Sequence, residues 1–285
     1  MKGLSCSVAV ATVAFLNGCQ SLENRVVYFP THSPEPVAGA DGFPLTTDSK
    51  GRRAYPVDFV AADGTPVHAW WCPYPGATGA VLYCHGNAGD LTAWAAPVAQ
   101  VLDELRESVL VFDYPGFGRS GGRPSEAGCY AAANAAYDWL IARGVAGNQI
   151  TVFGVSLGGG VAVDLAGRRP ARALVLVKTF TSVPDVAENL LAGVPAGRVM
   201  VNQFDSLAKI GRCPQPLFVA SGTKDQLIPE DAGVRLYEAA VSPKQFFRLE
   251  GSDHNDPLTP EFFAALRRFL ATTAATPGGA RSPGG

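Results

Sequence analysis

The chain has 285 residues, of which 47% are hydrophobic and 17% charged, and its formal net charge is −2. This composition excludes an intrinsically disordered chain, and the length suits one large α/β domain with a substantial core. Because the charge is slightly negative and no basic run occurs, nucleic acid is not expected as a partner.

Residues 1–18 are predicted to be a signal peptide. Lys2 precedes an apolar run from Leu4 to Leu16, which is short for a membrane span and typical of a secretory signal. The run ends in LNGC (16–19), which resembles a bacterial lipoprotein signal with Cys19 as the first, lipid-carrying residue of the mature chain. The resemblance implies a lipid anchor in the cell envelope, and Gln20 favours the outer membrane, facing the periplasm. An ordinary cleaved signal followed by a coincidental cysteine is the alternative.

Residues 19–54 are rich in proline, glycine and turn-forming residues and are predicted to be a tether, whose RVVYFP segment (25–30) is expected to pack on the domain surface. From Tyr55 two alternating apolar runs meet at Asp63-Gly64, which predicts an antiparallel hairpin at one edge of a sheet. This hairpin begins the predicted domain, residues 55–272. The tail, 273–285, has too few apolar side chains to pack and is expected to be disordered.

After the hairpin, short apolar runs alternate with segments of helical periodicity. The apolar runs are 80–84, 108–114, 149–155, 172–177, 216–221 and 245–250, and the helical segments are 91–106, 126–142, 157–168, 230–240 and 260–272. This alternation predicts βαβ units, and therefore an α/β fold with a mainly parallel twisted sheet and helices on both faces.

Two serines lie in the pattern G-x-S-x-G: Ser120 in GRSGG and Ser156 in GVSLG. Ser156 directly follows a predicted strand and precedes a predicted helix, which is the strand–turn–helix context of a nucleophilic serine. Ser120 lies in a loop, since no helix can begin before about Ser125. The overlapping GFGRSG (116–121) matches a dinucleotide fingerprint but is not in the first βα turn that such a site needs. We therefore expect Ser156 to react and Ser120 to be structural.

A serine nucleophile requires a base and a carboxylate that orients this base. His254 lies just beyond the last predicted strand, and Asp225 lies in the loop after the preceding strand. The order Ser156, Asp225, His254 is the chain order of α/β-hydrolase triads. Asp253 and Asp256 are rival acids, but they adjoin His254 too closely in sequence to reach its far ring nitrogen easily.

The segments YCHGNAGDL, FDYPGFGRSGG, GVSLGG, SGTKDQLIP and GSDHND occur in this order and resemble the α/β-hydrolase family. They are most similar to its small-lid branch of serine-aminopeptidase-like proteins. The resemblance implies an α/β-hydrolase fold with a short lid at about 178–215. It also implies an oxyanion hole made by the backbone N–H groups of Asn87 and Leu157, and a structural role for His85.

The same resemblance implies a serine hydrolase that cleaves a carboxylic ester or thioester through an acyl-enzyme on Ser156. Because a short lid leaves the site open, a small or surface-presented acyl group is the expected substrate. A serine peptidase is one alternative, although no acidic cluster near Lys178 is evident to receive a peptide α-ammonium group. A non-catalytic envelope lipoprotein that uses the fold as a scaffold is another. No metal-ligand spacing occurs, and no cofactor is expected.

The redox state of the remaining cysteines is open from the sequence. Cys72, Cys84, Cys129 and Cys213 follow the signal, and an envelope location would expose them to oxidising conditions. Four cysteines allow three complete pairings or none. Cys84 lies in an apolar run, so a buried free thiol is as compatible with the pattern as a disulfide.

Overall fold

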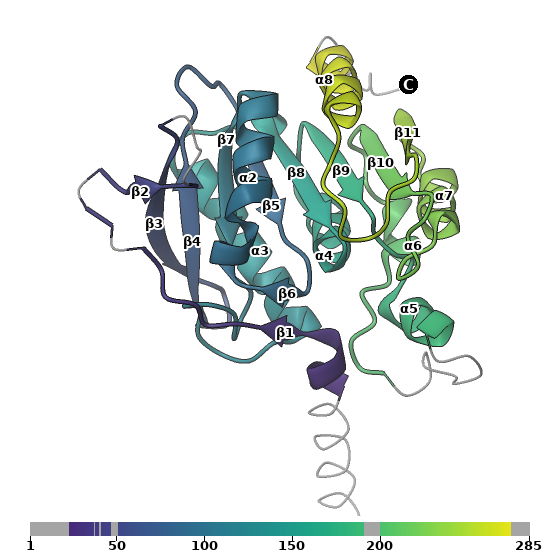
Figure 1. Cartoon of the computed structure of the whole chain (residues 1–285), viewed down its shortest axis with the longest axis horizontal. Coiled ribbons are helices and arrows are strands. Elements are labelled where there is room, and N and C mark those ends of the chain that lie inside the picture. The colour runs from purple at the N-terminus through teal and green to yellow at the C-terminus, as the bar shows by residue number, and fades with distance from the viewer. Residues whose placement is uncertain (1–22, 37, 40, 47–50, 191–199, 275–285) are drawn as a thin grey trace, which may run out of the picture.

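Figure 1 shows a computed structural model of the chain, which describes residues 23–36, 38–39, 41–46, 51–190 and 200–274. The main strands are β2 (Phe43–Pro44), β3 (Arg53–Val60), β4 (Pro66–Cys72), β5 (Ala80–Cys84), β7 (Ser108–Phe112), β8 (Ile150–Val155), β9 (Ala173–Val177), β10 (Leu217–Gly222) and β11 (Lys244–Leu249). They form a nine-stranded sheet in the order β11-β10-β9-β8-β5-β7-β4-β3-β2. Neighbouring strands from β11 through β10, β9, β8 and β5 to β7 pair in parallel. The remaining strands, β4, β3 and β2, form an antiparallel edge next to β7.

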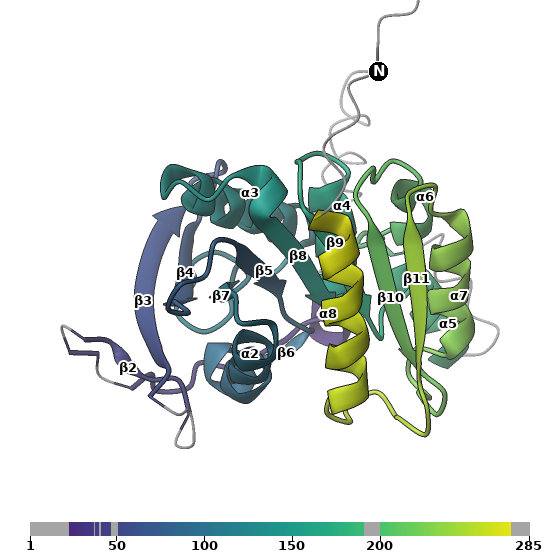
Figure 2. The same ribbon diagram turned by 90° about the horizontal axis from the view of Figure 1, so that it is seen from above.

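Helices cover both faces of this sheet. They are α2 (Leu91–Leu105), α3 (Glu126–Ala142), α4 (Leu157–Ala166), α5 (Val183–Leu190), α6 (Ser206–Ile210), α7 (Glu230–Ala239) and α8 (Pro260–Ala274). Figure 2 shows α2 and α8 on one side of the sheet and α3 on the other. Every strand and helix predicted by the alternation of apolar runs is present within about two residues of its expected bounds, which confirms the predicted fold class.

Successive side chains of a strand point to opposite faces of the sheet, so an apolar strand packs against helices on both faces. In β5, Ala80, Leu82 and Cys84 belong to the core beneath α3 and α4. Val81 and Tyr83, the alternate residues, belong to the core beneath α2 and α8. All five are at most 1% exposed, so this central strand places the residues that follow it rigidly.

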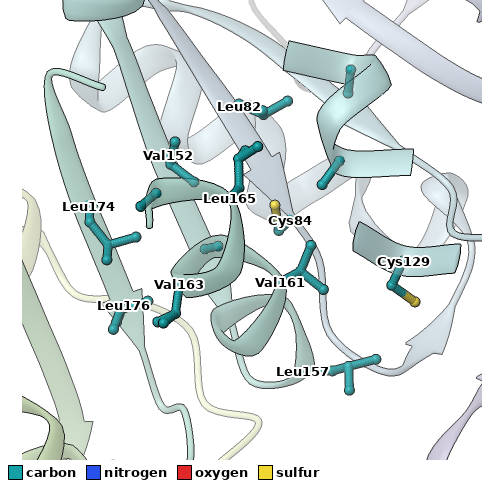
Figure 3. Packing of buried hydrophobic residues seen from close by; sticks show 14 of the residues in the cluster. Leu82, Cys84, Cys129, Val152, Leu157, Val161, Val163, Leu165, Leu174 and Leu176 are labelled. Atoms are coloured by element: carbon teal, nitrogen blue, oxygen red, sulfur yellow. The ribbon is translucent and has the colours of Figure 1, made fainter. Parts of the chain in front are cut away.

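The cysteines whose pairing was open from the sequence are free and buried: Cys72, Cys84, Cys129 and Cys213. Figure 3 shows Cys84 on the sheet and Cys129 on α3 within the apolar core around α4. Burial raises the pKa of all four thiols, to about 11 for Cys213 and further for the others. They therefore act as small apolar side chains in the core.

The segment that precedes the hairpin packs on the domain. Residues 23–27 are helical, and β1 (Phe29–Pro30) pairs with β6 (Ala88–Gly89). Tyr28, Phe43 and Leu45 are only 2%, 2% and 3% exposed. The packing expected for RVVYFP (25–30) is therefore present. The tether predicted for the rest of 19–54 is wrong at Phe43 and Leu45, which are buried in the domain. A few isolated apolar side chains bury themselves there, although the local proline and glycine content is typical of a linker.

Several predicted features lie outside the described residues. These are the signal peptide 1–18, Cys19, residues 191–199 of the predicted lid and most of the tail 273–285. Helix α8 continues to Ala274, two residues into the predicted tail. In the described ranges, no helix combines the length and the apolar character needed to cross a membrane.

Candidate active site

Ser156 lies at the sharp turn between β8 and α4. Its backbone has φ 52° and ψ −118°, and a positive φ is uncommon for a residue with a side chain. The conformation is held by a 3.0 Å hydrogen bond from its N–H to the carbonyl of Val177 and a 2.7 Å hydrogen bond from the Thr179 hydroxyl to its own carbonyl. A strained serine supported in this way is typical of a nucleophile at the carboxyl edge of a sheet.

Two glycines allow the turn to form. A Cβ at Gly158 would overlap the carbonyl of Cys84, and a Cβ at Gly154 would overlap the carbonyl of Gly158. The backbone that follows β5 also lies close to the serine, since a Cβ at Gly86 would come 3.7 Å from the Cβ of Ser156. The HGN sequence and the serine turn are therefore packed together, although they lie about 70 residues apart in the chain.

His254 connects Ser156 with Asp225. Its Nε2 lies 3.0 Å from the Ser156 Oγ, and its Nδ1 lies 2.7 Å from the Asp225 Oδ2. The second carboxylate oxygen of Asp225 accepts backbone hydrogen bonds from Leu227 at 3.0 Å and Ile228 at 2.8 Å. The Asp225 side chain is fully buried and that of His254 is 12% exposed. This arrangement orients the ring so that Nε2 can accept the serine proton.

The rival carboxylates shape the loop that carries His254. The Asp253 Oδ1 accepts the N–H of His254 at 2.7 Å, and the Asp256 Oδ2 accepts the N–H of Asp253 at 2.8 Å. Both contacts are with the backbone of the same turn. Asp225 is the carboxylate that contacts the ring.

Lys178 holds this loop from the side of the sheet. Its Nζ donates hydrogen bonds to the carbonyls of Asp253 at 2.6 Å, His254 at 3.1 Å and Asp256 at 2.8 Å. The residue is 2% exposed and has a φ of 47°. Burial lowers the pKa of the ammonium, and the nearby Asp225 carboxylate opposes this shift. No motif in the sequence predicts this contact, and its one local signal is a charged residue directly after a buried strand.

Both predicted oxyanion donors border the cavity above Ser156. Leu157 is the first residue of α4, so its N–H has no partner within the helix. Asn87 is positioned by two contacts: its side-chain amide donates to the carbonyl of Val27 at 3.0 Å, and its carbonyl accepts the N–H of Phe29 at 2.8 Å. The amino end of α4 also favours a negative charge at this position.

His85 and Ser120 make their hydrogen bonds to the backbone of the fold. His85 is completely buried, its Nδ1 donates to the carbonyl of Gly86 at 2.7 Å, and burial lowers its pKa to about 4. The Ser120 hydroxyl donates to the carbonyl of Asp113 at 2.8 Å and accepts the N–H of His68 at 2.9 Å. It therefore ties the loop after β7 to β4.

A cavity of about 1010 Å³ lies over Ser156. Its mostly apolar lining includes Phe29 of the N-terminal segment, Trp94 of α2 and Val183 of α5. The N-terminal segment thus supplies a part of the wall that the sequence did not predict. Within the described part of the chain, no three His, Cys, Asp or Glu side chains gather as ligands for a metal ion.

Comparisons with known proteins agree with this fold. The family described as alpha/beta hydrolase fold matches residues 79–201. The uncharacterized protein Rv2307c of Mycobacterium tuberculosis is 38% identical over 260 residues, which cover 89% of each chain. The uncharacterized protein YfhR of Escherichia coli K12 is 32% identical over 211 residues, which cover 70% of this chain and 73% of YfhR.

Two solved structures show how far the fold is shared. An esterase from Pyrococcus furiosus has a TM-score of 0.69 at 19% identity, covering 86% of this chain and 98% of its own. An acetyl xylan esterase from Paenibacillus sp. R4 has a TM-score of 0.61 at 20% identity, covering 91% and 93%. At these identities the likeness is one of fold, so the chemistry must be argued from the site itself.

Proposed function

Since this chain belongs to the α/β-hydrolase family, we propose that it is a serine hydrolase that cleaves a carboxylic ester or thioester through an acyl-enzyme on Ser156. The observation that carries the proposal is the hydrogen-bonded series from Asp225 through His254 to Ser156 at the cavity. Nucleophile, base and orienting carboxylate are within hydrogen-bond reach in the order that the chemistry requires.

In the first proposed step, the Ser156 Oγ attacks the carbonyl carbon of the acyl group while the His254 Nε2 takes its proton. Asp225 retains the hydrogen bond to Nδ1 and stabilises the imidazolium that forms. The backbone N–H groups of Asn87 and Leu157 would stabilise the oxyanion, each by about 3 kcal/mol. The imidazolium then protonates the alcohol or thiol as its bond to the acyl carbon breaks.

In the second step, His254 removes a proton from a water molecule that attacks the acyl-enzyme. The same two N–H groups would hold the second oxyanion. When the bond to the Ser156 Oγ breaks, the proton on Nε2 returns to the serine and the carboxylic acid leaves. Each step uses the base in the orientation that the buried Asp225 imposes.

The cavity lining supports a neutral substrate in preference to a peptide with a free amino terminus. Of the described lining residues, Lys178 and Asp256 carry a formal charge. Both already make hydrogen bonds to the backbone of the loop at 253–256. A peptide α-ammonium group would therefore compete with the contacts that hold His254, whereas the acyl part of an ester meets apolar walls.

The proposal is tested by labelling with a fluorophosphonate and by hydrolysis of a panel of acyl esters and thioesters. We expect labelling and turnover with the wild type and neither with Ser156→Ala. A correctly folded wild type that does not react with any probe would instead support a non-catalytic scaffold.

We also propose that Cys19 carries a lipid anchor and that the enzyme lies in the bacterial cell envelope, at the outer membrane and facing the periplasm. The LNGC sequence at 16–19 supports this location. A multiply acylated cysteine would anchor the chain stably, since one acyl chain alone binds only marginally.

A further inference from the structure

Exposed apolar side chains gather at the mouth of the cavity. Val26, Phe29 and Leu190 are 68%, 50% and 58% exposed and also line the cavity. Val201 is 49% exposed and directly follows Met200, another lining residue. We call Val26, Phe29, Leu190 and Val201 the mouth rim. In the described ranges only three further large apolar side chains are more than 40% exposed: Val60 at 65%, Ile141 at 41% and Val241 at 77%. The rim therefore concentrates exposed apolar surface at one place.

Buried polar contacts fix the N-terminal part of the rim to the domain. The Glu23 carboxylate accepts backbone hydrogen bonds from Val201 at 2.7 Å and Asn202 at 2.6 Å. The N–H of Phe29 donates to the carbonyl of Asn87 at 2.8 Å. The rim therefore presents its apolar side chains from a backbone that is held in place, and this backbone adjoins the proposed oxyanion hole.

The chain enters the domain at the same end as the mouth. In Figure 1 the helix at 23–27, β1 and α5 lie at one end of the molecule, toward which β5 and β8 point. Cys19 precedes Glu23 by four residues, which can span at most about 14 Å when fully extended. A membrane attachment at Cys19 would therefore keep this end of the molecule near the bilayer surface.

We propose that the mouth rim docks on a lipid bilayer and that the cavity takes its substrate, a neutral lipid ester or thioester with a long acyl chain, directly from it. This inference rests on the hydrolase function proposed above. An apolar rim around an apolar cavity lets an acyl chain pass from the bilayer to Ser156 without crossing water. The cavity of about 1010 Å³ is at the upper end of the size range of small-molecule sites, which suits a long chain.

The test uses the full chain in phosphatidylcholine vesicles and two substrates: soluble p-nitrophenyl butyrate and 4-methylumbelliferyl oleate embedded in the vesicles. The rim variant is Val26→Asp/Val201→Asp. The control is Ile141→Asp/Val241→Asp, which changes two exposed residues. Ile141 lies at the end of α3, before β8 begins, and Val241 lies just before β11, so both precede parallel strands, whereas the mouth lies where these strands end. The readout is the ratio of vesicle-ester turnover to soluble-ester turnover, because Val26 also lines the cavity.

We expect this ratio to fall on the order of tenfold in the rim variant, since a charge at the bilayer surface opposes apolar insertion, and to stay unchanged in the control. An unchanged ratio in the rim variant, or an equal fall in the control, overturns the docking inference while soluble-ester turnover keeps the hydrolase function intact. A wild type that neither hydrolyses the soluble ester nor reacts with a fluorophosphonate overturns the proposed function, and the docking inference with it.

Discussion

The ammonium group of Lys178 donates a 3.1 Å hydrogen bond to the main-chain carbonyl of His254, whose ring contacts Ser156. The same Nζ also donates to the carbonyls of Asp253 and Asp256. Three carbonyls of one turn therefore converge on one buried cation, which supplies the partners that a charge in this position needs. Through this turn, a residue at the end of β9 sets the position of the proposed base.

Lys178→Met keeps most of the side-chain volume and removes the three donors. We expect kcat to fall about 100-fold, because a small displacement of the ring misaligns the proton transfer. KM for a small ester should change little, since the apolar walls remain. Steady-state kinetics with a pH–rate profile measures both, and Lys224→Met, at an exposed lysine beside Asp225, is the control. Equal losses in the two variants, or a change confined to KM, would contradict a positioning role.

Ser156→Ala is expected to lower ester turnover by about 10⁶-fold and to abolish fluorophosphonate labelling. Ser120→Ala is the matched variant, because Ser120 occupies the same G-x-S-x-G pattern. It should keep labelling and turnover but destabilise the fold by about 2 kcal/mol, since two buried backbone groups lose their partner. Labelling and urea unfolding of both variants separate these effects. Loss of labelling in the Ser120 variant alone would reverse the assignment.

Asp225→Asn should lower kcat by roughly 10⁴-fold, because the amide favours the wrong tautomer of His254. His254→Ala should lose activity by several orders of magnitude for lack of a base. Asp256→Asn is the control: its side chain accepts a backbone N–H of the loop, and an amide oxygen can do the same. Burst and steady-state kinetics on a soluble ester compare the three. Near-normal turnover of Asp225→Asn would show that the acid lies elsewhere.

The contact between Glu35 and His68 predicts that the free energy of unfolding depends on pH. Burial alone would raise the pKa of Glu35, but hydrogen bonds from His68, Trp70 and Arg119 outweigh it and lower this pKa from 4.5 to about 2. Burial likewise disfavours the charged His68, but hydrogen bonds to Glu35 and Asp58 outweigh it and raise its pKa above 6.5. The contribution of Glu35 to the free energy of unfolding is therefore complete above pH 4.5 and is lost as the pH falls toward 2. The His68 contribution is complete below pH 6.5 and lost as the pH rises through its higher folded-state pKa.

Urea unfolding at about pH 5.5 and about pH 3 tests this dependence. Glu35→Gln should be less stable than the wild type at the higher pH, and the difference should narrow at the lower pH. Glu104→Gln is the control, because Glu104 pairs with Arg267 at the exposed surface and such pairs contribute little. A difference for Glu35→Gln that stays constant between the two pH values would refute the predicted linkage.

Cys19→Ser tests the proposed anchor. The wild-type chain should incorporate labelled palmitate and partition into the detergent phase, and the variant should do neither. Both proteins should hydrolyse soluble esters equally, since Cys19 precedes the described domain. Palmitate incorporation that survives the substitution would rule out Cys19 as the acylation site.

Local sequence determined the elements of this protein and their order. The continuous apolar run in strands such as Ala80–Cys84 indicates burial on both faces, and the helical periodicity between such strands predicts parallel crossovers. The choice of Ser156 over Ser120 was equally local, because it depends on which serine directly joins a strand to a helix. The chain order of Ser156, Asp225 and His254 matches that of α/β-hydrolase triads, and this match identified the proposed triad from the sequence.

Only the tertiary structure decided which distant groups surround these residues. The contact between Lys178 and the loop at 253–256 joins segments about 75 residues apart, and no periodic pattern encodes it. The N-terminal segment resembles a linker in composition. Its Glu23 side chain nevertheless accepts hydrogen bonds from the backbone of residues 201 and 202, and the N–H of Phe29 donates one to the carbonyl of residue 87. Such contacts depend on burial that other parts of the chain create. A charged side chain is stable in the interior only where the fold brings it hydrogen-bond partners. A linker-like segment becomes a cavity wall only where the fold offers it an apolar surface to pack against.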